Sequence, residues 1–520
     1  MTTQTANEAT CDRGLTKVLA AYAALVLLLV LVSARLWWQS PLDLIDHEFD
    51  YFLGLFASPD AALSETWVAL GRRLHLFGFV LVGALYLVAV KRLVKSPASL
   101  DTRAIVAWSA VVSLFFAIGM PWVSPDVFFY IGTGWLESHY GVSPYVTSAL
   151  AVPAAGHDQM FNNIYPGFLG STTAYGPLFQ KLAAVLAWLS GGNEKLALAL
   201  TKVTSLALHG ACSALVWRLA PANYKRVALF SYAANPLICF SVLTCAHNDH
   251  WMNLFVLLAL LAVSRRHWVL TGAALGIAFG IKYFPLVFVP VFGLAALVQQ
   301  RESGGTARNV LDAAKFTAGF AGVLALAYLP DPNALKAFSS VATTGVTVYR
   351  NSVYHLIDVV TAWALPAFFH EQGFLATYQN VGVFLRGAYI VLYPILLLSL
   401  VDRLRRDTLS GVAEACLAVA VLYFLLVNTC NQEWYLTWLM GLALVLPHDR
   451  ARSLAWWLSA CFLPLVIYTV NNPAPIWFIA NVALYCLVLV LGGRYMVSLV
   501  RSIAARDRNF ADELNVAGLA

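Results

Sequence analysis

Charged residues are scarce in this sequence. Only 12% of its 520 residues are Asp, Glu, Lys or Arg, whereas 60% are hydrophobic. A soluble globular chain is about a quarter charged, so the composition excludes an ordinary soluble enzyme. Several apolar runs reach about 20 residues, the length that crosses the hydrocarbon core of a bilayer as a helix. We therefore predict an all-α polytopic membrane protein.

Motifs that bind nucleotides are also missing. The sequence contains no P-loop, no dinucleotide fingerprint and no nucleophile elbow. An activated donor would have to arrive by another route, and a lipid phosphate in the bilayer is the expected one. The eight cysteines form no C-x-x-C pair, which argues against a disulfide framework and a thiolate metal site. The basic residues lie in short clusters between apolar runs, so we expect no nucleic-acid partner.

The apolar runs predict about 14 spans within a single membrane domain that covers residues 1–520. We place the spans near 16–38, 74–90, 104–120, 196–219, 227–246, 250–264, 268–282, 284–299, 311–329, 387–401, 410–428, 434–447, 453–470 and 475–492. The first run lacks a clear cleavage site, so we expect it to be a retained span rather than a signal peptide.

Two long segments, 121–195 and 330–386, lack a clear spanning run. The first mixes rings, prolines and polar residues, which favours an ordered loop with short helices lying on the bilayer, 178–190 among them. With the N-terminus in the cytoplasm, most Lys and Arg residues fall in cytoplasmic connections, as the positive-inside rule requires. Both loops and four polar clusters then lie on the extracytoplasmic side, and this convergence is the main argument for a site.

Asp126 is the first acid after the third apolar run. A carboxylate at that depth is only partly solvated, and it costs free energy unless it is paired or used. One interpretation is a catalytic base at the membrane surface. The other is an acid that caps or orients the following turn.

The run His247-Asn248-Asp249-His250 lies between two apolar helices. It could bind sugar hydroxyls, orient a second acid or hold a divalent cation, or it could be a polar turn that caps two helices. Two histidines and one acid in sequence do not define a metal geometry, so we predict no metal ligands. No cofactor is certain, and a divalent cation stays open.

Lys282 interrupts an apolar segment just before Pro285. A phosphate would neutralise its ammonium, and a helix break exposes backbone N–H groups; the alternative is snorkelling to the interface. Arg350 follows a Thr/Gly-rich stretch and precedes His355. Its forked donors suit phosphate oxygens, although a solvated loop cation would look the same.

A late cluster, Glu433-Trp434-Tyr435, mixes an acid with two rings at a helix mouth. Such rings suit sugar faces, and they equally suit the aromatic belt of a membrane interface. We group the candidate substrate-binding residues as Tyr130, Tyr175, His247, Asn248, Asp249, His355, Glu433, Trp434 and Tyr435.

The order of these motifs resembles the GT-C membrane glycosyltransferases, in particular the polyprenol-phosphate-mannose-dependent α-1,6-mannosyltransferases of actinobacterial lipoglycan assembly. The matching pieces are Asp126 to Tyr130, Gly141 with Pro144-Tyr145, Tyr175-Gly176-Pro177-Leu178, Asn235-Pro236, His247-Asn248-Asp249, Lys282 with Pro285, and Trp434-Tyr435. Two features depart from the family pattern: Glu433 stands where a proline is expected, and Leu243 to Ala246 replaces a more glycine-rich stretch.

The resemblance implies a GT-C-like fold in a cytoplasmic (inner) membrane, with the site on the extracytoplasmic side. It also implies inverting transfer of a hexose, with mannose as the family's sugar, from a polyprenyl-phosphate donor to a hydroxyl of a glycolipid or glycan. Asp126 maps onto the general base of that reaction, and Lys282 and Arg350 are our candidates to stabilise the phosphate. The alternatives are a transporter or flippase of lipid-linked sugars, or a glycan ligase or polymerase.

Overall fold

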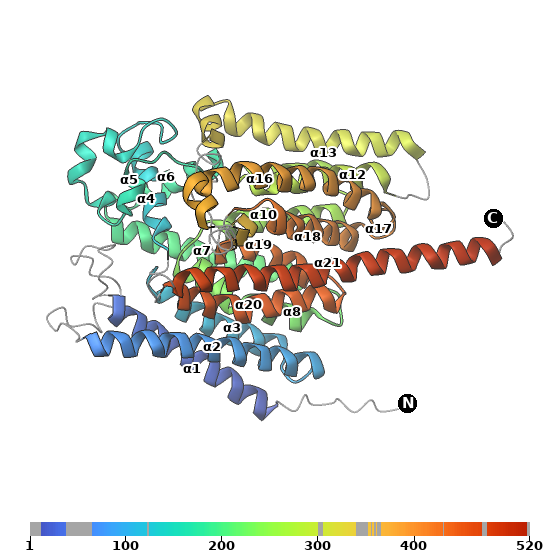
Figure 1. Ribbon diagram of the computed structural model, residues 1–520, viewed down its shortest axis with the longest axis horizontal. Helices are drawn as coiled ribbons and strands as arrows, with labels where there is room; N and C mark the ends of the chain where they lie inside the picture. Colours follow the sequence, from blue (N-terminus) through green and yellow to red (C-terminus); the bar gives the residue numbers. More distant parts are fainter. Residues whose placement is uncertain are drawn as a thin grey trace, which may run out of the picture.

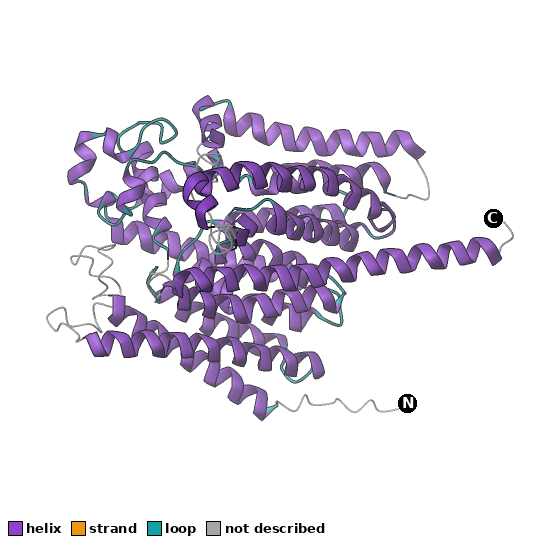
Figure 2. Ribbon diagram, in the orientation of Figure 1, coloured by secondary structure: helices purple, strands orange, loops and turns teal. Residues whose placement is uncertain are grey.

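The computed structural model describes residues 12–37, 65–121, 124–299, 305–339, 352–354, 356–357, 360, 366–429, 431–470 and 476–516. All regular secondary structure within these ranges is helical (Figure 2). Eight of the described helices are long and apolar enough to cross a membrane, and further apolar helices are shorter. The described residues thus confirm the class of an all-helical polytopic membrane protein, while the count of about 14 spans stays a prediction.

The first half of the chain alternates long helices with one polar segment of short helices (Figure 1). The helices outside that segment are α1 (Arg13–Trp37), α2 (Glu65–Lys95), α3 (Thr102–Ile118), α7 (Glu194–Leu219), α8 (Lys225–Ala233) and α10 (Asp249–Ser264). The polar segment between α3 and α7 contains α4 (Asp126–Ser138), η1 (Ala149–Ala151), η2 (Pro153–His157), η3 (Gln159–Phe161), α5 (Pro166–Leu169) and α6 (Pro177–Leu189). Two short pieces, α9 (Pro236–Ile238) and the π-helix η4 (Cys239–Thr244), extend α8.

The second half continues the bundle. Its elements are α11 (Trp268–Ile281), η5 (Phe284–Phe288), α12 (Val289–Val298), α13 (Gly305–Tyr328), η6 (Pro332–Lys336), α16 (Pro366–Ser399), α17 (Val401–Arg406), α18 (Thr408–Leu426), α19 (Glu433–Leu444), α20 (Asp449–Val470) and α21 (Ile476–Val516). Helix α16 begins at Pro366, so the latter part of the 330–386 segment is helical before the apolar stretch from Val381 starts. A helix lengthens at little cost once its first turn exists, which explains the early start.

Helices α11 and α13 touch through two glycines. A Cβ atom at Gly272 would lie 2.0 Å from the carbonyl oxygen of Phe316, and one at Gly319 would lie 2.1 Å from that of Val269. Only glycine permits this approach of two backbones. Because lipid tails are as apolar as side chains, close packing of this kind is what holds helices together in a bilayer.

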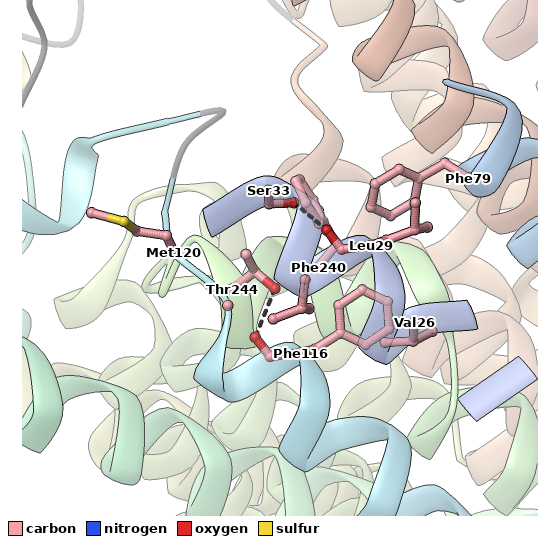
Figure 3. Close-up of a pocket in the computed structure, with 10 residues that line it drawn as sticks. Val26, Leu29, Ser33, Phe79, Phe116, Met120, Phe240 and Thr244 are labelled. Atoms are coloured by element: carbon pink, nitrogen blue, oxygen red, sulfur yellow. Dashed lines mark hydrogen bonds between the residues drawn. The ribbon is translucent and has the colours of Figure 1, made fainter. Parts of the chain in front are cut away.

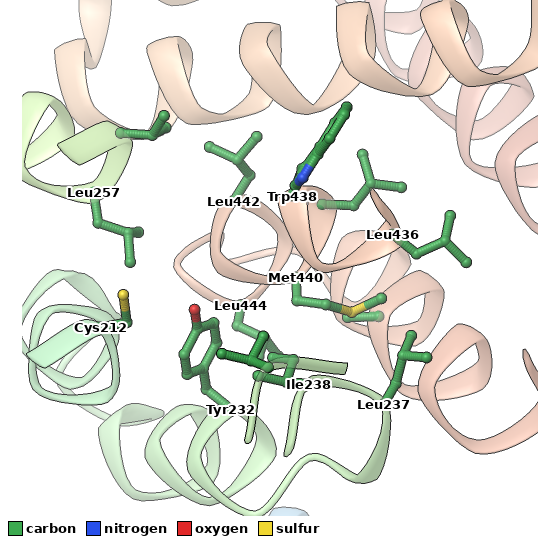
Figure 4. Packing of buried hydrophobic residues seen from close by; sticks show 14 of the residues in the cluster. Cys212, Tyr232, Leu237, Ile238, Leu257, Leu436, Trp438, Met440, Leu442 and Leu444 are labelled. Atoms are coloured by element: carbon green, nitrogen blue, oxygen red, sulfur yellow. The ribbon is translucent and has the colours of Figure 1, made fainter. Parts of the chain in front are cut away.

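The core of the bundle is built from branched and aromatic side chains of α7 to α10 and α19. Figure 4 shows Cys212, Tyr232 and Leu257 on one side of it and Leu436 and Met440 on the other. All five are buried. This core fixes α19 against α10, and both helices begin in the candidate site.

The break predicted around Lys282 is confirmed. Helix α11 ends at Ile281, and Lys282 has an extended backbone with φ −148° and ψ 140°. Pro285 follows at the start of η5. In a continuous helix Pro285 would have to donate an N–H to the carbonyl of Ile281, four residues earlier, but it has none, and its ring would clash with that carbonyl. The apolar run therefore splits into two shorter helices.

The bundle has two unlike ends. Helices α4, α5 and α6 gather at one end, and α17 lies at the other (Figure 1). We call them the α4 end and the α17 end. Helix α10 starts at Asp249 on the α4 side, and its 16 residues carry the chain to Arg265 and Arg266 near the opposite end.

Candidate functional site

Asp126 is the first residue of α4 and lies just after the end of α3, at the start of the polar segment. Its side chain is 20% exposed, and its Oδ2 lies 3.8 Å from Nδ1 of the fully buried His247. The hydroxyl of Tyr130, one turn further along α4, lies 3.3 Å from the same ring nitrogen. The carboxylate therefore stands at the rim of a buried polar cluster, within reach of solvent.

The setting of Asp126 favours its neutral form. Burial raises the pKa of this carboxyl to about 6, and the nearby charge of Asp249 adds to the rise. A hydrogen bond with Ser124 and the charge of Lys282 oppose it. Burial and the charge of Lys282 also lower the pKa of His247 well below its ordinary value. At neutral pH the pair is thus a carboxylate beside an uncharged imidazole, which is the state that a general base requires.

Asp249 begins α10, where a carboxylate is stabilised by the positive end of the helix dipole. It is fully buried, and its Oδ1 accepts hydrogen bonds from Nζ of Lys282 at 2.7 Å and from Nε1 of Trp438 at 2.5 Å. The Lys282 ammonium also donates to Oδ1 of Asn248 at 3.3 Å. This ion pair joins the starts of α10 and α19 to the break after α11.

The backbone before His247 is unusual. Residues 239–244 form a π-helix, and Ala246 has φ +54°, in the left-handed region that non-glycine residues seldom occupy. Both features cost free energy and concentrate at functional sites. They turn the chain sharply, so that His247, Asn248 and Asp249 leave η4 facing Asp126 and Lys282.

Lys282 lies under two rings. Its ammonium lies 4.8 Å from the ring centroid of Tyr435 and 5.4 Å from that of Trp438, at distances typical of cation–π contacts. The side chain is 14% exposed. Since Asn248 and Asp249 take two of its three N–H donors, one donor is left for a ligand.

Aromatic side chains form the rest of the wall. The rings of His247 and Trp434 stack with centroids 3.7 Å apart and planes 22° apart. Tyr130 meets Tyr175 edge-on at 5.0 Å, and the Tyr175 hydroxyl lies 3.4 Å from that of Tyr130. Glu433, the first residue of α19, is 1% exposed and lies inside this wall rather than on its surface.

The Tyr-Gly-Pro-Leu motif brings α6 to this wall. A Cβ at Gly176 would lie 2.2 Å from the carbonyl oxygen of Gly280, and the N–H of Gly176 donates to Ile281 at 3.1 Å. Only glycine fits there. Pro177 then starts α6, a position that suits proline because its N–H is not needed. The motif therefore docks Tyr175 beside the break that presents Lys282.

The structure thus brings most of the predicted site residues together. Those in mutual contact are Asp126, Tyr130, Tyr175, His247, Asn248, Asp249, Lys282, Trp434 and Tyr435. Glu433 is buried next to Trp434. Arg350 and His355 lie outside the described residues. The chemical roles of all these residues stay predictions.

Lys202, on α7, is a candidate that sequence reasoning missed. It is 5% exposed, and its ammonium lies within hydrogen-bonding distance of four backbone carbonyls. These belong to Ala117 (3.1 Å), Gly119 (2.6 Å), Leu243 (2.9 Å) and Thr244 (2.8 Å). They lie at the C-terminal ends of α3 and η4, where a cation is favourable. Lys202 therefore ties together the two segments that lead to Asp126 and to His247. An isolated lysine in an apolar run was the available signal.

A small cavity lies beside this junction, between α1, α2, α3 and η4 (Figure 3). Its walls include Leu29, Phe79, Phe116 and Phe240, and the Thr244 hydroxyl donates to the carbonyl of Phe116 at 2.8 Å. The volume is about 10 Å³, enough for one water at most. This cavity is therefore too small to receive a lipid chain.

Metal binding was the remaining possibility for this cluster. Within the described residues, no three or more His, Cys, Asp or Glu side chains gather closely enough to hold an ion. His250 turns away from Asp126 and pairs through Nε2 with Nδ1 of His209 at 3.0 Å. The second histidine of the run is therefore a core residue of the bundle.

The fold and the site together define a polytopic membrane protein with a polar, aromatic-walled site at one end of its bundle. Residues 54–298 match the family model described as alpha-(1->6)-mannopyranosyltransferase, N-terminal domain. The chain is also 26% identical over 186 residues to alpha-(1->6)-mannopyranosyltransferase A of Corynebacterium glutamicum. That alignment covers 35% of this chain and 36% of the relative. The resemblance to the mannosyltransferases is confirmed by these matches, and the model covers Asp126, Asp249 and Lys282.

Proposed function

We propose that this protein is a membrane mannosyltransferase. It takes the sugar from a polyprenyl-phosphate donor and transfers it, with inversion, to a hydroxyl of a glycolipid or glycan on the outer face of the membrane. One observation carries the proposal: Asp126, an ionisable carboxylate at a solvent-accessible rim, faces the buried Asp249–Lys282 pair within residues that match a mannosyltransferase family model.

The chemistry follows from these groups. Asp126 accepts the proton of the acceptor hydroxyl while the hydroxyl oxygen attacks the anomeric carbon of the donor. The bond from that carbon to the phosphate oxygen breaks, and the lipid phosphate leaves with both electrons. Its developing negative charge needs a preorganised cation. Lys282 offers its remaining N–H donor, and Arg350 is the second candidate.

The aromatic wall suits the sugar. Trp434, Tyr435 and Tyr175 present ring faces and hydroxyl edges beside the acid, a combination that packs against C–H faces of sugars and hydrogen-bonds their hydroxyls. His247 and Asn248 supply further polar edges. Atoms Nε2 of His247 and Nδ2 of Asn248 are buried and have no hydrogen-bond partner among the described residues, so they are the donors or acceptors that a substrate would satisfy.

The proposed donor and the proposed side of the membrane rest on two features of the chain: its lack of nucleotide-binding motifs and the position of its basic residues. With no nucleotide-binding motif in the sequence, a lipid phosphate is the activated donor that an integral membrane protein can reach. The site lies at the α4 end, while basic connections such as Arg265-Arg266 lie toward the α17 end. The positive-inside rule then predicts that the α17 end lies in the cytoplasm and the site outside.

The phosphoester bond of the donor itself activates the sugar, so we propose that the reaction needs no organic cofactor. Chelation of divalent cations, followed by an activity measurement, tests whether a metal ion is required.

Reconstitution tests the proposal. Purified protein in liposomes is incubated with radiolabelled polyprenyl-phosphate mannose and a membrane extract that supplies acceptors. We expect a new mannosidic product and release of polyprenyl phosphate. Movement of label between leaflets without a product would identify a flippase instead, and transfer of a preassembled glycan would identify a ligase or polymerase.

A further inference from the structure

A second pocket lies between α20 and α21, far from Asp126. Helix α19 starts at Glu433, next to Trp434 in the candidate site, and runs toward the other end of the bundle, where α20 begins at Asp449. The pocket is near this start and has a volume of about 270 Å³. Its polar lining consists of Arg450, Ser453, Arg494, Tyr495 and Ser498.

The pocket carries an excess of positive charge. Arg450 and Arg403 both bind the carboxylate of Glu414, and Arg403 also donates to the Ser502 hydroxyl at 2.8 Å. Arg494 makes no ion pair with any described acid, and its side chain is exposed. Two guanidinium groups thus share one carboxylate, and the third, Arg494, lines the pocket without a described acid. The nearby Asp449 is 97% exposed and holds Arg452 at 3.5 Å, so it does not neutralise the pocket.

Two buried polar groups at the pocket lack partners. The Nε of Arg450 and the hydroxyl of Tyr495 make no hydrogen bond with any described residue. Tyr495 is 2% exposed, so water cannot freely compensate its hydroxyl. Buried polar groups in native proteins are nearly always satisfied. A ligand with several acceptor oxygens would satisfy both groups.

The other wall of the pocket is apolar and partly exposed. Trp457, 47% exposed, lines the pocket with Leu454 and Leu491. Val490 and Val497 on α21 are likewise exposed on a helix that is apolar enough to span a membrane. A tryptophan beside arginines is typical of the headgroup level of a membrane.

We propose that this pocket binds a phosphate group, with Arg450 and Arg494 as its guanidinium partners and Tyr495 as a hydroxyl donor. Guanidinium groups match phosphate oxygens with paired N–H donors. The phosphate belongs either to an anionic lipid, whose chains would cover Trp457, or to a soluble phosphate. On the positive-inside orientation the site faces the cytoplasmic leaflet, which is rich in anionic lipid. This proposal is independent of the sugar-transfer activity.

Native mass spectrometry of the delipidated full-length protein tests the lipid arm, with phosphatidylglycerol against phosphatidylcholine. We expect tighter binding of phosphatidylglycerol, and about a tenfold loss of its affinity in Arg494→Gln because one charge-assisted contact is removed. Arg501→Gln is the matched control, since Arg501 is an exposed arginine on the same helix outside the pocket lining. Equal affinity for the two lipids, or an equal loss in Arg501→Gln, would overturn the lipid source.

Thermal stability in inorganic phosphate against chloride tests the soluble arm. A phosphate-specific rise in Tm that Arg494→Gln abolishes supports the pocket with a soluble occupant. Absence of both this rise and a preference for phosphatidylglycerol overturns the proposal. Tyr495→Phe adds a second check: the ligand-free Tm should be unchanged, because the hydroxyl has no partner to lose, while phosphate binding weakens. A lower ligand-free Tm would show that the hydroxyl is structural.

Discussion

Two buried charged clusters lie at opposite ends of the bundle, and they are built differently. The site cluster, at the α4 end, consists of Asp126, His247, Asp249 and Lys282. The arginine cluster, at the α17 end, consists of Arg403, Glu414 and Arg450. In the first, one acid pairs with a lysine and the other acid faces a histidine; in the second, two arginines share one acid.

The clusters also differ in how fully their hydrogen bonds are satisfied. Both oxygens of Glu414 accept from a guanidinium, and it is buried between α17, α18 and α20. In the site cluster, Nε2 of His247 and Oδ2 of Asp249 have no hydrogen-bond partner among the described residues. In the arginine cluster the buried carboxylate is thus fully paired, and its unpaired atom, Nε of Arg450, belongs to the pocket described above. A paired buried carboxylate holds helices together, whereas unpaired atoms of a buried acid and imidazole carry a free-energy cost that a substrate can relieve. We therefore expect the site cluster to govern activity and the arginine cluster to govern stability.

Removing the charge of Asp126 should have the largest effect. In Asp126→Asn the amide keeps the shape but cannot take up a proton, so kcat should fall by about 10²–10⁴-fold, the usual contribution of a general base. The thermal unfolding temperature should stay within the range of the wild type, because the carboxylate stands at the rim. Initial rates of mannosyl transfer in liposomes measure this.

The control for that variant is Asp402→Asn. Asp402 is an exposed acid whose ion pair with Arg405, at 3.4 Å, lies at the α17 end. It should leave kcat unchanged. Wild-type turnover in Asp126→Asn would remove Asp126 from the chemistry and would break the contrast between the two ends.

Glu414→Gln should show the opposite pattern. It leaves two buried guanidinium groups facing a neutral amide, and losing one partner of a buried ion pair costs about 3–5 kcal/mol. The thermal unfolding temperature should therefore drop clearly, while kcat per folded molecule stays close to that of the wild type. Unfolding followed by tryptophan fluorescence, combined with active-fraction measurements, separates the two effects.

The exposed Asp402–Arg405 pair again supplies the control, since removing it should cost about 0–1 kcal/mol. If Glu414→Gln reduced kcat as strongly as Asp126→Asn, the two clusters would not divide stability from activity, and the comparison would fail.

The site was partly predictable because its signals are local. A lysine before a proline in an apolar run predicts the break at Lys282, and charge asymmetry between connections brings Asp126 and His247 to one side. The pairing of Lys282 with Asp249 was not predictable, because the two residues are 33 positions apart in sequence and their contact depends on how α10 and α11 pack. Lys282 was expected to meet a phosphate, and the structure gives it a carboxylate first.

Lys202 shows the same limit more sharply. Its acceptors are backbone carbonyls, and carbonyls carry no residue signature, so nothing in the sequence marks Ala117 or Leu243 as its partners. The sequence reveals the isolated lysine, but it does not reveal which backbone carbonyls accept its hydrogen bonds. Likewise the start of α16 at Pro366 depends on helix propagation beyond the apolar run rather than on hydrophobicity.

Replacing Lys202 should lower activity and stability together, by less than the two variants above. Lys202→Met keeps the length of the side chain and removes its three N–H donors, so the ends of α3 and η4 lose their shared cation. We expect a fall in kcat of about tenfold, the equivalent of one charge-assisted hydrogen bond, with KM nearly unchanged because substrate contacts remain.

Lys202→Arg is the conservative comparison, since a guanidinium also donates to carbonyls. It should recover part of the lost kcat. A purely structural role would instead lower the amount of folded protein in Lys202→Met and leave kcat per folded molecule at the wild-type level.

The pH profile gives the smallest change and the finest test of the site cluster. Because burial raises the pKa of Asp126 to about 6, the carboxyl is protonated below that pH and cannot act as a base. We expect kcat/KM to be flat above pH 6 and to fall about tenfold per pH unit below it, since kcat/KM reports the free enzyme. The charge of Lys282 lowers this pKa, so Lys282→Met should move the acid limb to higher pH. Arg405→Gln, an exposed change at the α17 end, should leave it in place. An acid limb near pH 4 in the wild type, where an ordinary aspartate titrates, would contradict this prediction. Either another group would then limit the reaction, or burial would not raise the pKa of Asp126.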